Sequence, residues 1–193
     1  MKNYYSEFVE KFIQETRDLD LTSLYVPFLN HVIPGGKILD AGCGSGRDTK
    51  YFLNKGYLVE AMDSCAEMAQ LSSVFTGIEV KQKSFEEIDF QDCFDGIWAN
   101  ASLLHVRKDE MEKVYKKLFI ALKREGILFV SYKYGDFEGM REGRYFSDYT
   151  ISSFGKYISN LDLFSIKRIW KTNDQRITHH GQFWINVLLV KDL

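Results

Sequence analysis

The chain has 193 residues, of which 45% are hydrophobic and 15% aromatic, and its 25 Lys and Arg residues nearly balance 27 Asp and Glu residues, for a net charge of −2. This composition excludes an intrinsically disordered chain, because such chains are poor in apolar residues and carry a large charge imbalance. The near-neutral charge also argues against a protein that binds mainly nucleic acid, because phosphate binding needs a basic surface.

The length fits one domain covering residues 1–193. Residues 184–190 form an uncharged apolar stretch far shorter than the roughly 20 residues of a membrane helix, and the charged N-terminus lacks the apolar core of a signal peptide. Cys43, Cys65 and Cys93 are too few and too scattered for a disulfide framework or a metal site. The sequence therefore predicts a soluble, cytoplasmic monomer or homodimer that holds no metal and binds no membrane.

Helical and strand-like segments alternate along the chain. In the first half we expect helices at 5–13, 23–32 and 47–55, strands at 37–41, 57–62, 78–81 and 96–99, and a capping box of Ser64 and Glu67 opening a further helix. In the second half we expect helices at 109–122 and 151–160 and strands at 127–132, 163–171 and 182–191. This alternation predicts a single α/β domain, with a parallel sheet covered by helices on both faces.

A glycine-rich turn follows the first expected strand. Gly42, Gly44 and Gly46 let the backbone turn sharply and let a ligand approach it closely, and the helix that follows presents N–H groups to a negative group. Asp63 ends the next strand, 21 residues after Gly42. In nucleotide-binding α/β folds an acid at this position binds ribose hydroxyls. The pattern predicts a ligand with an adenosine-like ribose.

The spacing of the glycines distinguishes between possible ligands. A dinucleotide site needs G-x-G-x-x-G, whereas this chain has G-x-G-x-G with Arg47 at the third dinucleotide position. The carboxylate of Asp40 is unfavourable beside a pyrophosphate but suits an ammonium group. S-adenosylmethionine carries a ribose, an ammonium group and no phosphate. The sequence therefore favours this cofactor over a nicotinamide dinucleotide, and a methyltransferase over an oxidoreductase.

Three segments resemble the class I S-adenosylmethionine-dependent methyltransferases. Residues 40–46 (DAGCGSG) are similar to the first motif of that family, 94–100 (FDGIWAN) to its fourth-strand motif, and 122–128 (LKREGIL) to the segment before its fifth strand. Residues near both ends, among them Tyr4, Tyr5, Arg144 and Trp184, resemble a bacterial subgroup labelled tellurite-resistance-like. The resemblance implies a Rossmann-like, mostly parallel sheet of seven strands in the order 3-2-1-4-5-7-6, with the last strand antiparallel and helices on both faces.

The resemblance also implies the residues that contact the cofactor. The N-terminal helices, residues 1–33, are expected to cover the cofactor site, with Tyr5 and Thr16 as contacts. Asp40 is expected to hold the ammonium group directly or through water, Asp63 the ribose hydroxyls, and Asn100 and Ala101 the sulfonium end. The remaining expected contacts are Gly42, Cys43, Gly44, Ser45, Gly46, Ser64, Met68, Ser84, Phe85 and His105.

The reaction and its methyl acceptor are less closely determined. His105 or Tyr132 is the candidate general base for an oxygen or nitrogen acceptor, although His105 could equally pack over the cofactor. Residues 133–149 combine glycines and aromatic residues and predict a lid, in which Arg141, Arg144 and Tyr145 bind a small anionic substrate. Arg176 is a further candidate, or else pairs with Asp174.

The preferred function is methyl transfer to a small-molecule nucleophile. The alternatives are methylation of RNA or protein, and an inactive sensor that binds S-adenosylmethionine without turnover. Low net charge and the lack of a basic tail argue against an RNA substrate, whereas the sensor shares every expected cofactor contact.

Overall fold

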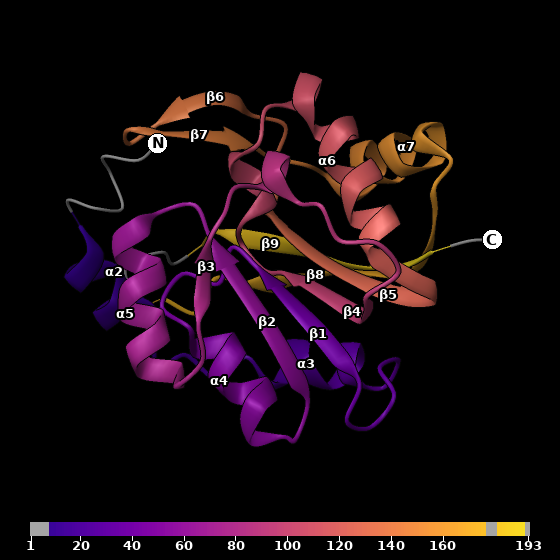
Figure 1. Ribbon diagram of the computed structural model, residues 1–193. Coiled ribbons are helices and arrows are strands. Elements are labelled where there is room, and N and C mark those ends of the chain that lie inside the picture. Colours follow the sequence, from indigo (N-terminus) through magenta and orange to yellow (C-terminus); the bar gives the residue numbers. More distant parts are fainter. Residues whose placement is uncertain (1–7, 177–180, 192–193) are drawn as a thin grey trace.

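The computed structural model describes residues 8–176 and 181–191. Its main sheet runs in the order β3-β2-β1-β4-β5-β9-β8 (Figure 1). The strands are β1 (Lys37–Ala41), β2 (Leu58–Asp63), β3 (Val80–Gln82), β4 (Phe94–Ala99), β5 (Leu122–Lys133), β8 (Phe164–Asn173) and β9 (Phe183–Lys191). Neighbours from β3 to β5 are parallel, and β9 is antiparallel to both β5 and β8. The predicted strand order is confirmed, since β8 and β9 are the sixth and seventh strands of this sheet.

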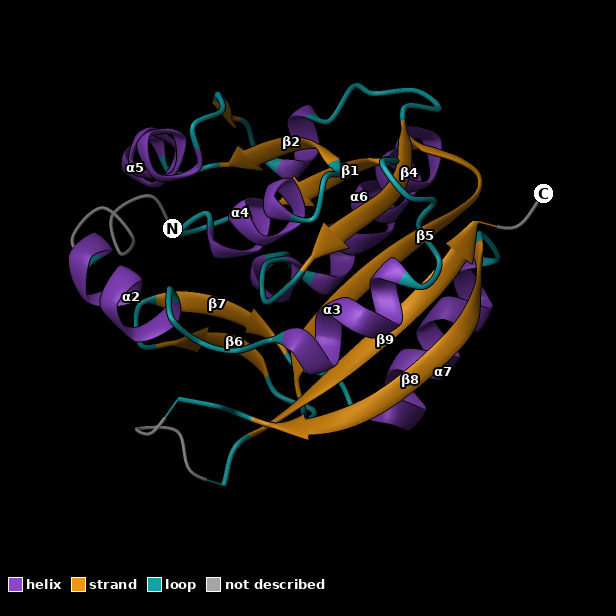
Figure 2. Ribbon diagram, turned by 90° about the horizontal axis from the view of Figure 1, so that it is seen from below, coloured by secondary structure: helices purple, strands orange, loops and turns teal. Residues whose placement is uncertain are grey.

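Helices cover both faces of the sheet. The helices are α2 (Val9–Thr16), α3 (Thr22–Leu29), α4 (Arg47–Asn54), α5 (Ala66–Thr76), α6 (Lys108–Ala121) and α7 (Ile151–Leu161), with short 3-10 turns η1 (Phe85–Glu87) and η2 (Leu103–His105). Figures 1 and 2 show α3 and α4 on one side of the sheet and α6 and α7 on the other. This arrangement confirms the α/β prediction.

Two hydrophobic cores result from the alternation of side chains along the strands. Leu39 and Ile97 point to the face covered by α6, whereas Ile38 and Trp98 point to the face covered by α3. All four are at least 99% buried, and the Trp98 ring stacks on Phe129 with centroids 3.9 Å apart. Because both faces are buried, the central strands read as continuous apolar runs rather than alternating ones.

A small hairpin lies between β5 and α7 where the sequence predicts a lid without strands. Strands β6 (Glu138–Arg141) and β7 (Arg144–Ser147) pair antiparallel as a separate sheet. The turn residues Glu142 and Gly143 have φ of 50° and 74°, the conformation that a two-residue hairpin turn requires. The strands are too short and too polar to stand out in the sequence.

The predicted capping box at Ser64 is wrong. Helix α5 begins after Cys65, and the N–H of Cys65 donates to Oδ1 of Asp63 at 2.9 Å. The N-cap position thus falls on Cys65, one residue later than the predicted box requires, and Asp63 bonds to the backbone of this residue.

Candidate active site

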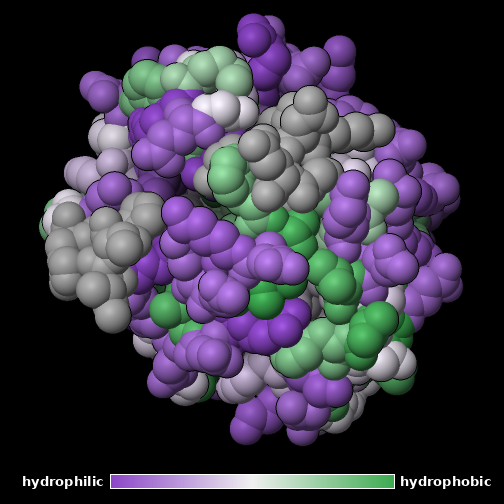
Figure 3. Space-filling view, turned by 90° about the vertical axis from the view of Figure 1, so that its left-hand side faces the viewer, coloured by the Kyte–Doolittle hydropathy of each residue, from purple (hydrophilic) through white to green (hydrophobic). Residues whose placement is uncertain are grey.

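A cavity of about 960 Å³ opens at the carboxyl ends of the parallel strands. It is lined by the glycine turn after β1, the ends of β2, β4 and β5, the β6–β7 hairpin and the start of β9. Ligand sites in open α/β sheets lie at this edge, and the volume is at the upper end of the range for small-molecule pockets. Figure 3 views the side that carries α2 and the hairpin, where hydrophobic side chains gather in the middle among hydrophilic ones.

The glycine turn has a conformation that side chains would disrupt. Gly42, Gly44 and Gly46 have φ of 83°, 52° and 76°, values that L-residues rarely adopt. A Cβ on Gly42 would lie 2.5 Å from the Cβ of Ser102. The N–H groups of residues 42 and 43 both donate to the carbonyl oxygen of Met62, at 2.9 and 3.0 Å. The turn is therefore shaped and held by backbone groups.

Asp63 joins this turn to the end of β2. Its Oδ2 accepts from the N–H of Gly44 at 2.9 Å, and its Oδ1 accepts from the N–H of Cys65. The side chain lines the cavity, and burial raises its pKa. Each carboxylate oxygen can accept a second hydrogen bond, so Asp63 can hold the loop and still receive two hydroxyl groups from a ligand.

Asp40 lies behind the turn. It is 2% exposed and accepts a hydrogen bond from Oγ1 of Thr49 at 2.6 Å, and it does not line the cavity. Burial, with the nearby charge of Asp48 adding to it, raises the pKa of Asp40 to about 8. Its predicted contact with an ammonium group, directly or through water, stays a prediction.

Asp48 lines the cavity instead, and the sequence reasoning missed it. Its carboxylate accepts from Tyr25 Oη at 2.5 Å, Trp98 Nε1 at 2.8 Å and Asn100 Nδ2 at 3.1 Å. Arg47 adds two hydrogen bonds, at 2.6 and 3.0 Å. Burial alone would raise its pKa, but Arg47 and these donors hold the pKa of Asp48 below its usual range. The sequence feature that could have identified Asp48 is the Arg-Asp pair in the first turn of the helix after the glycines.

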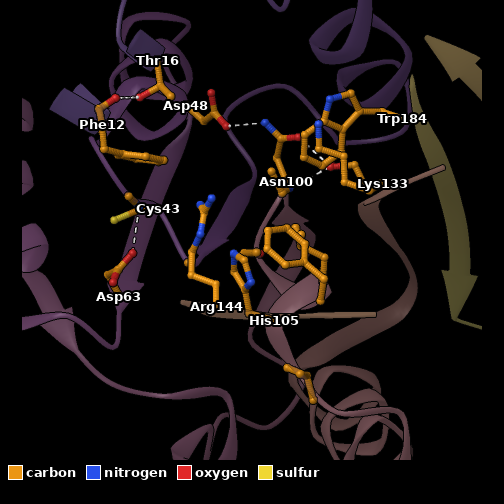
Figure 4. A pocket seen from close by; sticks show the side chains of 18 of the residues that line it. Phe12, Thr16, Cys43, Asp48, Asp63, Asn100, His105, Lys133, Arg144 and Trp184 are labelled. Carbon is orange, nitrogen blue, oxygen red and sulfur yellow. Dashed lines mark hydrogen bonds between the residues drawn. The ribbon is translucent and has the colours of Figure 1, made fainter. Parts of the chain in front are cut away.

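His105 lies at the end of η2 and lines the cavity. Its Nδ1 is 2.7 Å from the carbonyl oxygen of Tyr145. A carbonyl can only accept, so Nδ1 carries the proton and Nε2 is the basic nitrogen. Burial lowers the pKa of His105 to about 4, and the charge of Arg144 contributes. Figure 4 shows the Arg144 side chain pointing into the cavity beside His105.

Tyr132 does not line the cavity, which corrects its prediction as a base. It is fully buried, and its hydroxyl lies 3.0 Å from that of Tyr115. Successive strand residues point to opposite faces. Tyr132 therefore points toward the α6–α7 core, while its neighbours Ser131 and Lys133 line the cavity.

A buried ionic cluster forms the end of the cavity near β8 and β9. Asp174 accepts from Lys133 Nζ at 2.6 Å, from Trp184 Nε1 at 2.9 Å and from Arg176 at 3.0 and 2.8 Å. Lys133 also donates to Gln182 at 2.6 Å. Burial alone would raise the pKa of Asp174, but Arg176 and Lys133 hold it well below its usual range. Arg176 thus lines the cavity and also makes the pair with Asp174 that the sequence left open.

The other expected substrate residues also line the cavity. Arg141 donates to Asp148 at 2.7 Å, and the hydroxyl of Tyr145 donates to Glu138 at 2.8 Å. Arg144 has 13% of its side chain exposed and lies 3.6 Å from Glu142, which is 72% exposed. Arg144 thus lines the cavity with a side chain that is largely buried, although its carboxylate neighbour is exposed.

Most of the other expected cofactor residues come together. The residues that line the cavity are Thr16, Gly42, Cys43, Gly44, Ser45, Ser64, Met68, Ser84, Phe85, Asn100 and Ala101. Gly46 is the N-cap of α4 and does not line the cavity, and Tyr5 lies outside the described residues. Within residues 8–176 and 181–191, no group of three or more His, Cys, Asp or Glu side chains is placed to hold a metal ion. No helix of this part of the chain has the length and apolar content needed to cross a bilayer.

Comparison with known families and proteins adds independent findings. Residues 39–130 match the family model described as a methyltransferase domain. An uncharacterized methyltransferase of Staphylococcus carnosus is 27% identical over 119 residues, which are 61% of this chain and 56% of that protein. The chain thus aligns with about half the length of this relative. The terminal residues that resemble the tellurite-resistance-like subgroup lie outside the family match, so that part of the resemblance stays a prediction.

Solved structures share the fold at low sequence identity. A 1,6-didemethyltoxoflavin-N1-methyltransferase of Burkholderia thailandensis, solved with 1,6-didemethyltoxoflavin and S-adenosylhomocysteine, has a TM-score of 0.79 at 22% identity and covers 98% of this chain and 84% of its own. A methyltransferase of Methanosarcina mazei has a TM-score of 0.77 at 19% identity, over 91% and 100%. The [4+2]-cyclase SpnF has a TM-score of 0.69 at 12% identity, over 89% and 80%. These likenesses establish the class I methyltransferase fold.

Proposed function

Residues 39–130 match the methyltransferase-domain family model, and from that match we propose that the chain transfers the methyl group of S-adenosylmethionine to a small-molecule nucleophile. The observation that carries the proposal is the hydrogen bond of 2.9 Å that joins Gly44 to Asp63, both of which line the cavity. It leaves a glycine-rich turn beside a carboxylate whose two oxygens can each accept one more hydroxyl. A ribose next to a slender methionine chain fits this arrangement.

The cavity has room for a second reactant beside the cofactor. The glycine turn and Asp63 occupy one end, and Lys133 and Trp184 line the other, within the same volume of about 960 Å³ (Figure 4). The toxoflavin methyltransferase of the same fold was solved with its small-molecule ligand together with S-adenosylhomocysteine. Both points support a small acceptor that binds next to the cofactor.

Bound S-adenosylmethionine supplies a methyl group already activated by its sulfonium. The protein then has to align the acceptor, exclude water and receive at most one proton. With its pKa lowered to about 4, His105 is neutral at pH 7 but a weak base. We assign Nε2 of His105 the role of accepting a hydrogen bond from the acceptor. Arg144, beside it, suits an acceptor that carries negative charge.

Calorimetric titration with S-adenosylhomocysteine tests the cofactor assignment. We expect micromolar binding by the wild-type protein and at least a tenfold loss in Asp63→Asn, because the amide cannot accept hydroxyl hydrogen bonds on both of its atoms. Asp162→Asn is the matched control: Asp162 is exposed at the end of α7, outside the cavity, with φ of 52°, a conformation that asparagine adopts readily. Wild-type protein that binds no S-adenosylhomocysteine would overturn the proposal.

A catalytically inactive sensor is the second candidate. SpnF shows that this fold also occurs in a protein described as a cyclase rather than a methyltransferase, and fold alone does not determine the reaction. Screening thiols, oxyanions, amines and heteroaromatic compounds with methyl-labelled cofactor separates the two. Binding of S-adenosylhomocysteine without label transfer to any acceptor would favour the sensor.

A further inference from the structure

The backbone at the end of β4 forms a corner that three side chains hold in place. Ala101 has φ of 51°, a left-handed conformation uncommon for alanine. Its N–H donates to Oγ of Ser131 at 2.7 Å, and the same hydroxyl donates to Oδ1 of Asn100 at 2.8 Å. Nδ2 of Asn100 in turn donates to Asp48. Residues 100 and 101, here called the β4 corner, are thus fixed from β5 on one side and from α4 on the other.

Asp48 connects the β4 corner to the N-terminal helices. Tyr25 of α3 donates to one of its oxygens, and Trp98 and Asn100 donate to the other. Arg47, which pairs with this carboxylate, also donates to the carbonyl oxygen of Thr16 at the end of α2, at 2.9 Å. Both oxygens of Asp48 are therefore fully used within the protein. The carboxylate therefore fixes the positions of these protein groups and does not bind a ligand directly.

The β4 corner lies against the glycine turn. Ser102 Oγ donates to the carbonyl oxygen of Ala41 at 2.7 Å, and the missing Cβ of Gly42 is what allows Ser102 to approach this closely. The order β2-β1-β4 places the switch point of the sheet between β1 and β4. A ligand whose ribose binds Asp63 on β2 extends across β1 toward β4. Its far end then meets the β4 corner, with the acceptor end of the cavity beyond.

We propose that Asp48 and Ser131 are positioning residues that hold the β4 corner against the sulfonium and its methyl group, so that this network distinguishes S-adenosylmethionine from S-adenosylhomocysteine. The inference rests on the proposed function and deepens it. The two ligands differ by one methyl group and one positive charge. The glycine turn and Asp63 contact parts that both ligands share, so discrimination has to come from groups at the β4 side.

The affinity ratio for the two ligands, measured by calorimetry, tests this. Asp48→Asn leaves the guanidinium of Arg47 unbalanced beside the cation, so we expect the ratio of affinities for S-adenosylmethionine over S-adenosylhomocysteine to fall about tenfold. Ser131→Ala changes no charge but removes the hydrogen bonds that hold the β4 corner. We expect the same ratio to fall about threefold, because the affinity for S-adenosylmethionine decreases while that for S-adenosylhomocysteine does not. Adding Ala101→Gly should recover part of that loss, because glycine adopts the left-handed conformation without strain.

Ser147→Ala is the matched control for the serine variant. Ser147 is a fully buried serine whose hydroxyl donates to the carbonyl oxygen of Val106 at 2.8 Å, and it does not line the cavity. The ratio of the affinities of Ser147→Ala for the two ligands should equal that of the wild type. Equal weakening of both ligands in Ser131→Ala, or no change in the ratio, overturns the proposal. If Asp48→Asn does not fold, as judged by circular dichroism, the comparison of Ser131→Ala with Ser147→Ala tests the proposal alone. Wild-type protein that binds neither ligand refutes the proposed function itself, a different result from binding with an unchanged ratio.

Discussion

The two ends of the cavity are built in different ways. The end at the glycine turn is made by backbone: positive φ angles at three glycines, and N–H groups that bond to Asp63 and to the carbonyl of Met62. The end at β8 and β9 is made by side chains, with Asp174 bound by Lys133 of β5, by Trp184 of β9 and by its near neighbour Arg176. The first end comes from one continuous segment, residues 40–65, whereas the second joins β5, the end of β8 and β9.

This difference separates what is general in the fold from what is particular to this chain. A backbone-built site can bind a ligand whose shape is constant, and many sequences can form it as long as the glycines and the acid are kept. A site built by charged side chains changes its selectivity with each substitution. We therefore expect the glycine turn to determine cofactor binding and the ionic cluster to stabilise the other end of the cavity, and the variants below test that division.

The largest expected effect is at the side-chain end. Asp174→Asn leaves Lys133 and Arg176, whose side chains are 9% and 17% exposed, without a balancing charge. We expect the free energy of unfolding to fall by about 3 kcal/mol, the cost of removing one partner of a buried ion pair. Urea titration measures it, and binding of S-adenosylhomocysteine should stay within twofold of wild type.

Asp92→Asn is the control for this variant. Asp92 pairs with Lys191 at 3.0 Å but is 62% exposed, and an exposed pair contributes less than about 1 kcal/mol. If Asp174→Asn destabilises the protein no more than Asp92→Asn, the ionic cluster does not hold this end together.

Two glycines with nearly the same φ, Gly42 in the glycine turn and Gly77 at the end of α5, separate strain from steric contact. Gly77, with φ of 82°, has nothing within 4 Å of a Cβ position, whereas Gly42, with φ of 83°, has Ser102 at 2.5 Å. We expect Gly77→Ala to lower the free energy of unfolding by about 1 kcal/mol. Gly42→Ala should lower it by about 2–3 kcal/mol, since overpacking adds to strain, and should also abolish binding of S-adenosylhomocysteine. Equal losses in the two variants would mean that contact with Ser102 does not shape the turn.

The smallest effect is a pH dependence at Asp40. Its pKa of about 8 in the folded protein exceeds the value of about 4 in an unfolded chain. Between these values the folded state holds a proton that the unfolded state has released, so stability falls as the pH rises and the loss is complete above pH 8. Asp40→Asn should therefore be more stable relative to wild type at pH 9 than at pH 7, by about 1–2 kcal/mol. Identical pH dependence in urea titrations of the two proteins would contradict this.

Local sequence was sufficient for the alternation of strands and helices and for the glycine turn, whereas the strand order came from the resemblance to a known family. Strand and helix periodicities are short-range patterns, and a positive φ at Gly42 or Gly44 is a property of one residue and its neighbours. The same holds for Asp63, whose position at the end of β2 follows from the strand itself. The Glu142-Gly143 turn of the hairpin was also present as a local signal, although the four-residue strands around it were too short to predict.

Only the tertiary structure decided which side chains face the cavity at its other end. Tyr132 and Lys133 are adjacent in sequence, yet one points toward the α6–α7 core and the other lines the cavity, because a shift of one residue in a strand reverses the face. Asp48 and Asp174 gain their roles from donors that lie up to 52 and 41 residues away. Such contacts depend on the register and packing of whole strands and helices, which no local pattern in the sequence specifies.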